Sequence, residues 1–142
     1  MVAPNPTFDS KNLHQLEMTS ILVLDDGVSL KRQCQALADA PDLFLTVAKT
    51  GAEAVREVME TDFDVIICNM QMPQMPGEMF YRAVERVKPA LCSRFIFIGT
   101  SATSQRAEKF IENVDGLILY KPVKISQLVR MVTLAAARGR IH

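Results

Sequence analysis

Hydrophobic and polar positions form two alternating kinds of segment from about residue 19 onward. Short aliphatic and aromatic runs, typical of strands buried on both faces, alternate with longer stretches in which apolar residues recur at helical spacing. The predicted strands are SILVL (20–24), LFLTVA (43–48), DVIIC (64–68), RFIFIG (94–99) and GLILY (116–120). A predicted helix follows each strand, over 28–40, 50–59, 79–87, 106–114 and from residue 125 onward.

The second and last helices carry the clearest local signals. Thr50 can cap the second helix, and Glu53 can reach back as in a capping box. The inner face of the second helix is predicted to carry Ala54, Val55, Val58 and Met59. The inner face of the last helix is predicted to carry Ile125, Leu128, Val129 and Val132.

This alternation predicts the α/β fold class. Parallel strands joined by right-handed crossovers place helices on both faces, so we expect a doubly wound, flavodoxin-like parallel sheet of five strands in the order 2-1-3-4-5. A closed eight-fold barrel needs about 200 residues or more, and this chain has 142. In an open sheet of this type the functional site lies beyond the carboxyl ends of the strands.

Composition indicates one ordinary globular domain. Lys plus Arg (16) equals Asp plus Glu (16), so no broad electrostatic footprint for nucleic acid or a membrane is expected. No apolar run is long enough to span a membrane and MVAPNPTFDS does not resemble a signal peptide, which favours a cytoplasmic location. We expect a disordered or linker-like extension at 1–18, a domain at 19–138 and a tail at 139–142.

The cysteines and histidines point to no metal or disulfide chemistry. The chain has three cysteines, Cys34, Cys68 and Cys92. Their odd number, wide spacing and apolar surroundings argue against a disulfide framework or a zinc site, so we expect reduced thiols in the core. His14 and His142 fall in the predicted tails and offer no ligand geometry.

Polar residues gather at the ends of the predicted strands. Asp25 and Asp26 follow the first strand, Asn69 the third, Thr100 the fourth and Lys121 the fifth. Adjacent carboxylates repel each other unless Lys121, a divalent metal or solvent offsets their charge, and Mg²⁺ is the natural metal for such oxygen ligands. Each of these residues also has a simpler explanation when taken singly. The aspartates and Thr100 could be no more than caps of a turn or helix, and Lys121 could be no more than a solvated surface charge.

Together these segments resemble a known family. The order ILVLDD, AKTGAEAV, FDVIICNMQMPQMPG, IGTSA and YKPV is similar to the CheY-like receiver domain of two-component response regulators, over about residues 20–137. The resemblance implies a Mg²⁺ site formed by Asp25, Asp26 and the backbone carbonyl of Gln71. It also implies phosphate binding by Thr100 and Lys121, and a Lys121–Pro122 bond that is commonly cis. Asn69 falls on the phosphoacceptor position, where the family has an aspartate that a histidine kinase phosphorylates.

Asn69 is the main departure from the family pattern. A carboxamide has no anionic oxygen and cannot form the acyl phosphate, so the chain resembles a pseudo-receiver. Losing one anionic ligand should weaken Mg²⁺ binding, although an amide can still hydrogen-bond to Lys121 or Thr100. The family's switch aromatic is also missing: its position falls on Ile118 or Leu117, and Tyr120 is out of register.

The leading functional hypothesis is a non-enzymatic signalling module that binds a histidine kinase, an output protein or a second copy. The face formed by the predicted fourth helix, fifth strand and fifth helix, with Phe110, Tyr120 and Met131, is the family's usual contact surface. The alternative is a phosphorylatable receiver, from a single-domain regulator or a hybrid kinase, that carries an Asp-to-Asn change at position 69. A small enzyme or ligand-binding domain would need a glycine-rich phosphate loop, and none follows the first strand.

Overall fold

The computed structural model describes residues 19–72 and 74–140, the last two by their backbone only. The predicted extension at 1–18 and the last residues of the predicted tail lie outside these ranges. The elements in chain order are β1 (Thr19–Leu24), α2 (Lys31–Asp39), β2 (Leu43–Ala48), α3 (Gly51–Glu60), β3 (Val65–Asn69), α4 (Gly77–Val87), the 3₁₀ helix η1 (Pro89–Arg94), β4 (Phe95–Gly99), α5 (Gln105–Asn113), β5 (Leu117–Tyr120) and α6 (Ile125–Arg140). The predicted domain end at 138 therefore falls within α6.

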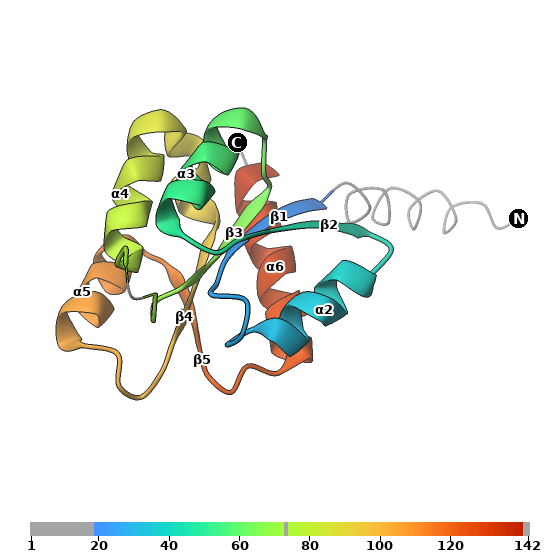
Figure 1. Cartoon of the computed structure of the whole chain (residues 1–142). Coiled ribbons are helices and arrows are strands. Elements are labelled where there is room, and N and C mark those ends of the chain that lie inside the picture. Colours follow the sequence, from blue (N-terminus) through green and yellow to red (C-terminus); the bar gives the residue numbers. More distant parts are fainter. Residues whose placement is uncertain (1–18, 73, 141–142) are drawn as a thin grey trace, which may run out of the picture.

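All neighbouring strands are parallel, and their order is β2-β1-β3-β4-β5. Helices α3, α4 and α5 cover one face of the sheet, and α2 and α6 cover the other (Figure 1). The predicted doubly wound α/β fold and its strand order are confirmed. No helix within the described residues is long and apolar enough to cross a membrane.

The apolar runs of β1, β3 and β4 follow from their central positions. Every residue of β3 and β4 is buried, because helices cover both sides of the sheet, whereas β2 and β5 lie at its edges and are only partly buried. The predicted cap of α3 is also confirmed. Thr50 Oγ1 accepts a hydrogen bond from Glu53 N (3.1 Å), and Glu53 Oε1 reaches back to accept one from Lys49 N (3.0 Å).

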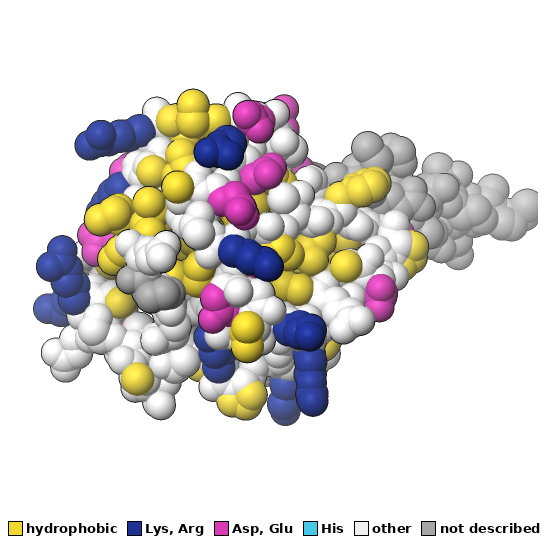
Figure 2. Space-filling model, in the orientation of Figure 1, with side chains coloured by type: hydrophobic (Ala, Val, Ile, Leu, Met, Phe, Trp, Pro, Cys, Tyr) yellow, Lys and Arg dark blue, Asp and Glu magenta, His cyan; other side chains and the backbone are white. Residues whose placement is uncertain are grey.

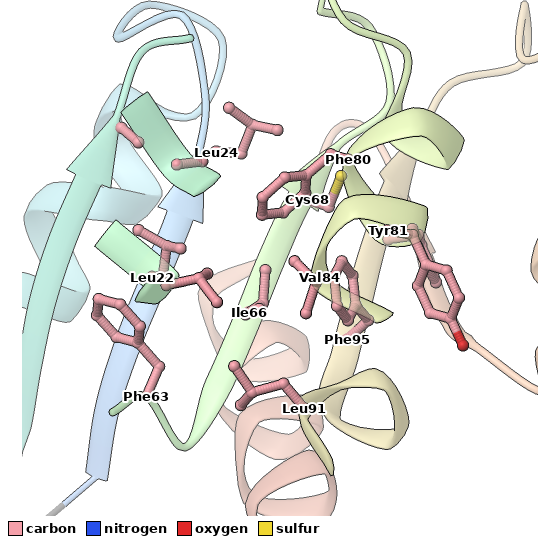
Figure 3. Close-up of a cluster of buried hydrophobic side chains, with 14 of the residues drawn as sticks. Leu22, Leu24, Phe63, Ile66, Cys68, Phe80, Tyr81, Val84, Leu91 and Phe95 are labelled. Carbon is pink, nitrogen blue, oxygen red and sulfur yellow. The ribbon is translucent and has the colours of Figure 1, made fainter. Parts of the chain in front are cut away.

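The sheet separates two hydrophobic cores. The core under α3, α4 and α5 is rich in aromatic rings, several of which Figure 3 shows between α4 and the central strands. Tyr81 meets Phe95 and Phe110 edge-on at centroid distances of 5.0 and 5.2 Å, and Phe95 stacks on Phe97 at 5.3 Å. Each such pair adds about 0.5–1.5 kcal/mol beyond the area it buries, so these rings anchor α4 and α5 to the sheet.

Four predictions about side-chain positions were wrong. Met59 and Val129 are exposed because each lies one residue, and so about 100° around its helix, from a buried neighbour. Ile125 is exposed as the first residue of α6, and Phe110 is buried in the aromatic core and does not contribute to the outer face. Among the cysteines, which are all free, only Cys68 is fully buried; Cys34 and Cys92 are half-buried against the two cores.

Candidate functional site

The site lies where the carboxyl ends of the parallel strands meet. Leu24 pairs with Cys68 and Asn69 pairs with Ile98, so the residue after β1, Asp25, comes level with the last residue of β3. Asp25 N donates to Ala48 O (3.0 Å), which fixes the start of the loop after β1 against β2. The parallel register, set by the hydrophobic strands, thus brings Asp25 beside Asn69.

Asp25 is a fully buried carboxylate whose oxygens both accept hydrogen bonds. Its Oδ2 accepts from the backbone N–H groups of Gly27 (2.9 Å) and Leu30 (3.3 Å). Its Oδ1 accepts from Asn69 Nδ2 at 2.8 Å. Burying a carboxylate is costly unless it is paired or hydrogen-bonded, and these donors meet that requirement.

Asn69 is held at both ends of its amide and is 1% exposed. Its Nδ2 donates to Asp25, and its Oδ1 accepts from Gln71 N at 2.9 Å. Since an ionised carboxylate can only accept, the amide must turn its NH₂ group toward Asp25. The hydrogen bonds of Asn69 thus go to Asp25 and to the turn that begins at Gln71, and not to Lys121 or Thr100, which its amide can in principle reach.

Asp26 is exposed and closes the turn that leads into α2. Its Oδ1 accepts from Val28 N and Ser29 N, both at 2.9 Å. The backbone N–H of Ser29, followed by that of Val28, lowers the pKa of Asp26 below 3.8, and the positive charge of Lys121 contributes in the same direction. Asp26 is thus ionised at neutral pH and lies within electrostatic reach of Lys121.

Thr100 and Lys121 flank the site from β4 and β5. Thr100 Oγ1 accepts from Ala102 N (3.1 Å), and Thr100 N donates to Thr103 Oγ1 (2.8 Å), so this residue organises its own loop. Lys121 N donates to Gly99 O at 2.8 Å, and the Lys121–Pro122 bond is cis, as the resemblance implied. Lys121 takes part in none of the ion pairs formed by the described residues.

Lys49 is a further cation near the acidic pair, which the sequence analysis missed. Its Cε lies 3.2 Å from where a side chain at Gly27 would begin, and Gly27 has a φ of +89° that other residues rarely adopt. Lys49 and Asp26 also line the same small cavity, of about 140 Å³. The only sequence signal was the position of Lys49 at the end of the second strand, directly before the capping motif of α3.

The turn after Asn69 packs its methionines into the molecule. Met72 is buried, and Met70 and Met75 pack against the core under α3, α4 and α5. A side chain at Gly77 would overlap Met70, and one at Gly51 would overlap Met75. At Gly51 the overlap includes Met75 Cβ, which is fixed to the backbone, so glycine is strongly favoured there; at Gly77 it is mainly the flexible end of Met70 that would have to move.

As they lie, the acidic residues do not fit a Mg²⁺ ion well. Within residues 19–72 and 74–140, no group of three or more Asp, Glu, His or Cys side chains could hold a metal. A third carboxylate would belong at position 69, where the Asn69 NH₂ group, a donor, faces Asp25. Mg²⁺ coordination by Asp25 Oδ1 would require this hydrogen bond to break.

Comparison with known proteins identifies the family. Residues 21–133 match the model of the response regulator receiver domain. The chain belongs to this family. Receiver domains act in two-component signal transduction and are generally not enzymes.

Similar curated proteins agree with this assignment. Over 88% of its length the chain is 28% identical to protein-glutamate methylesterase/protein-glutamine glutaminase 3 of Rhodospirillum rubrum, and it covers 36% of that protein. Over 84% of its length it is 32% identical to the transcriptional regulatory protein ZraR of Salmonella typhimurium, and it covers 27% of that protein. The chain thus spans about a third or less of these two curated relatives.

Solved structures support the fold. A CheY-like receiver domain protein from Methanospirillum hungatei superposes with a TM-score of 0.75 at 17% identity, over 86% of this chain and 96% of that one. Chemotaxis protein CheY4 of Vibrio cholerae gives a TM-score of 0.71 at 24% identity, over 83% and 98% of the two chains.

Proposed function

We propose that this receiver domain is a protein-interaction module that is not phosphorylated at position 69. The observation that carries the proposal is the buried hydrogen bond from Asn69 Nδ2 to Asp25 Oδ1, at the place where the family has its acceptor aspartate. Forming an acyl phosphate requires an anionic carboxylate oxygen to attack phosphorus. The amide oxygen is neutral and the nitrogen lone pair is delocalised, so neither atom can serve as that nucleophile.

The remaining site residues keep roles that do not depend on phosphate. Asp25 and Asp26 anchor the loop after β1 through backbone N–H groups, and Thr100 anchors the loop after β4. The carboxylates and the Gln71 carbonyl are the remnant of a Mg²⁺ site that now binds the ion weakly. Thr100 and Lys121 are the remnant of the phosphate-binding pair.

The partner surface we assign to this function is the α5–β5–α6 face. It carries exposed apolar side chains at Tyr120 and Leu134. Leu134 lies one turn before Arg138, whose NH1 donates to Asp115 O just ahead of β5 (3.1 Å). Tyr120 Oη donates to Glu108 Oε2 (3.1 Å), which joins β5 to α5 on this face. Exposed apolar side chains favour protein contact, so we assign this face to a histidine kinase, an output protein or a second copy. We propose a cytoplasmic, non-enzymatic role without nucleic acid or membrane contact.

The second candidate is a receiver that is phosphorylatable in its natural form and carries an Asp-to-Asn change at position 69. The observation that favours it is the retention of Asp25, Asp26, Thr100 and Lys121 around position 69. Reading codon 69 of the source gene separates the two candidates, because an aspartate codon there supports the second.

The chemistry is tested by intact mass spectrometry after treatment with acetyl phosphate and Mg²⁺. We expect the parent chain to gain no phosphoryl group, whereas Asn69→Asp is the matched variant that can regain one. Asn69→Asp combined with Lys121→Ala is the control, since it restores the acid but removes the ammonium of the phosphate-binding pair. A phosphoryl gain by the parent chain, mapped to this pocket, would refute the proposal.

A further inference from the structure

The outer side of α4 forms a ridge with a hollow on each side. Between α3 and α4 lies a hollow of about 390 Å³, and between α4 and α5 lie hollows of about 650 and 320 Å³. Arg82 lines all of them. We call the stripe formed by Met79, Arg82, Arg86 and Val87 the α4 ridge.

The α4 ridge is apolar at its two ends. Met79 is 55% exposed and Val87 is 42% exposed, and their separation along the helix is about 12 Å. Figure 2 shows hydrophobic side chains gathered over α3 and α4, with Lys and Arg and also Asp and Glu side chains around them. Exposed Met and Val side chains beside apolar hollows are typical of surfaces that bind another protein segment.

The charged residues around the hollows are predominantly basic. Those that line the hollows are Arg82, Arg86, Arg106 and Lys109, against a single acid, Glu78. Arg106 Nε lies 3.8 Å from Glu78 Oε1, which offsets part of this excess. Although the whole chain has a formal net charge of zero, this surface favours an acidic partner.

Arg82 is fixed in place at the centre of this surface. Its guanidinium carbon lies 5.6 Å from the Tyr81 ring centroid and 5.4 Å from that of Phe110, and its NH1 pairs with Glu85 at 3.2 Å. These contacts hold the side chain before any partner arrives, so less conformational entropy is lost on binding. Preorganised arginines of this kind are frequent binding hot spots.

We propose that the α4 ridge is a second protein-docking surface, and that its occupant is a short amphipathic helix of a partner protein. The apolar side chains of that helix would fill the hollows beside Met79 and Val87, and Asp or Glu on its flanks would pair with Arg86, Arg106 and Lys109. This surface is distinct from the α5–β5–α6 face: α5 borders both, but no residue of β5 or α6 lines the hollows. The proposal does not depend on Asn69.

The probe is a display library of helical peptides of random sequence, selected on the full chain. Recovered peptides are titrated against isotope-labelled protein, and their binding sites are mapped by amide chemical shifts. The test variant is Arg86→Glu/Lys109→Glu, which leaves Arg82 and the aromatic core unchanged. Lys124→Glu/Arg130→Glu, at exposed positions just before and within α6, is the control with the same change in net charge.

We expect the selected peptides to be rich in Asp, Glu and large apolar residues, and to shift amides of α4 and the start of α5. Their affinity should fall about tenfold or more in Arg86→Glu/Lys109→Glu and change little in the control. The proposal is overturned if no peptide is enriched, if the peptides are neutral or basic, if they map to the α5–β5–α6 face, or if both double variants weaken binding equally.

Discussion

Replacing Asn69 by aspartate tests the electrostatic reasoning about the pocket. The substitution removes the donor that now faces Asp25 at 2.8 Å and puts an acceptor in its place, with almost no change in shape. Two buried carboxylates then share one pocket. Lys121, which forms no ion pair within the described residues, and Lys49 are the nearest sources of positive charge.

The expected cost has two parts. A hydrogen bond to a charged group contributes about 1.5–3 kcal/mol. Two unit charges about 4 Å apart repel by about 4 kcal/mol at an effective dielectric constant of 20. The pair avoids part of this repulsion by binding a proton, so we expect a net loss of about 3 kcal/mol in the free energy of unfolding at neutral pH without metal. For a domain of this size that lowers the melting temperature by about 10 °C.

The pH dependence has a definite sign. The carboxyl pair of Asn69→Asp should titrate with a pKa above the unfolded value, because each charge disfavours the other. The destabilisation of Asn69→Asp is therefore largest at neutral and higher pH. It disappears as the pH falls toward about 4, because the carboxyl pair then becomes protonated in both the folded and the unfolded state.

The assay is a set of thermal melts of the parent, Asn69→Asp and Asn69→Ala, with and without Mg²⁺ at constant ionic strength. Mg²⁺ should restore most of the loss in Asn69→Asp and should leave the parent and Asn69→Ala nearly unchanged. Asn69→Ala is the control because it removes the donor without adding charge. The reasoning is wrong if Mg²⁺ stabilises the parent as much as Asn69→Asp, or if Asn69→Asp without metal is as stable as the parent.

Three further expectations concern the turn after Asn69, the stability at acid pH and the α5–β5–α6 face. Gly51→Ala should cost about 1–3 kcal/mol, because its Cβ would lie 2.7 Å from Met75 Cβ, which cannot move without the backbone, and urea unfolding would measure this. The pKa of Asp26 is lowered in the folded state, so the stability that Asp26 contributes is present at neutral pH and is lost below about pH 4. In Asp26→Asn the melting temperature should therefore fall less than in the parent as the pH is lowered through that range. Leu134→Glu, at an exposed position on the α5–β5–α6 face, should weaken any self-association in sedimentation without lowering the melting temperature; a parent that stays monomeric at high concentration would contradict this.

The sequence predicted the sheet well because burial on both faces leaves an unambiguous pattern. β3 and β4 are continuous apolar runs, and helical periodicity separates them clearly from their neighbours. The outer parts of helices were less predictable. Val129 follows buried Leu128 and is itself exposed, since the depth of each position depends on how α6 sits on the sheet. The 3₁₀ helix Pro89–Arg94 was missed because a short segment has no periodicity to detect.

The site residues were predictable as types but their contacts were not. The ends of the predicted strands indicated Asp25, Asn69, Thr100 and Lys121 as site residues. The hydrogen bond from the Asn69 amide to Asp25, however, depends on the strand register that sets these two residues level, and this register was not predicted. Lys49 was missed because its closeness to Gly27 arises from two loops that meet only in the folded chain. Contacts between loops are set by tertiary packing, and local sequence patterns carry little information about them.

The presence of Asp25 therefore does not by itself indicate a metal site. A buried carboxylate requires partners, and three donors from the chain itself, Gly27 N, Leu30 N and Asn69 Nδ2, already supply them. Two of these donors belong to the backbone of the loop after β1, so the loop would lose its anchor if Asp25 were replaced. Asp25 consequently has a structural role that persists without Mg²⁺. In the folded protein the amide of Asn69 stabilises the same buried carboxylate that a cation would otherwise offset, and it does so without requiring Mg²⁺.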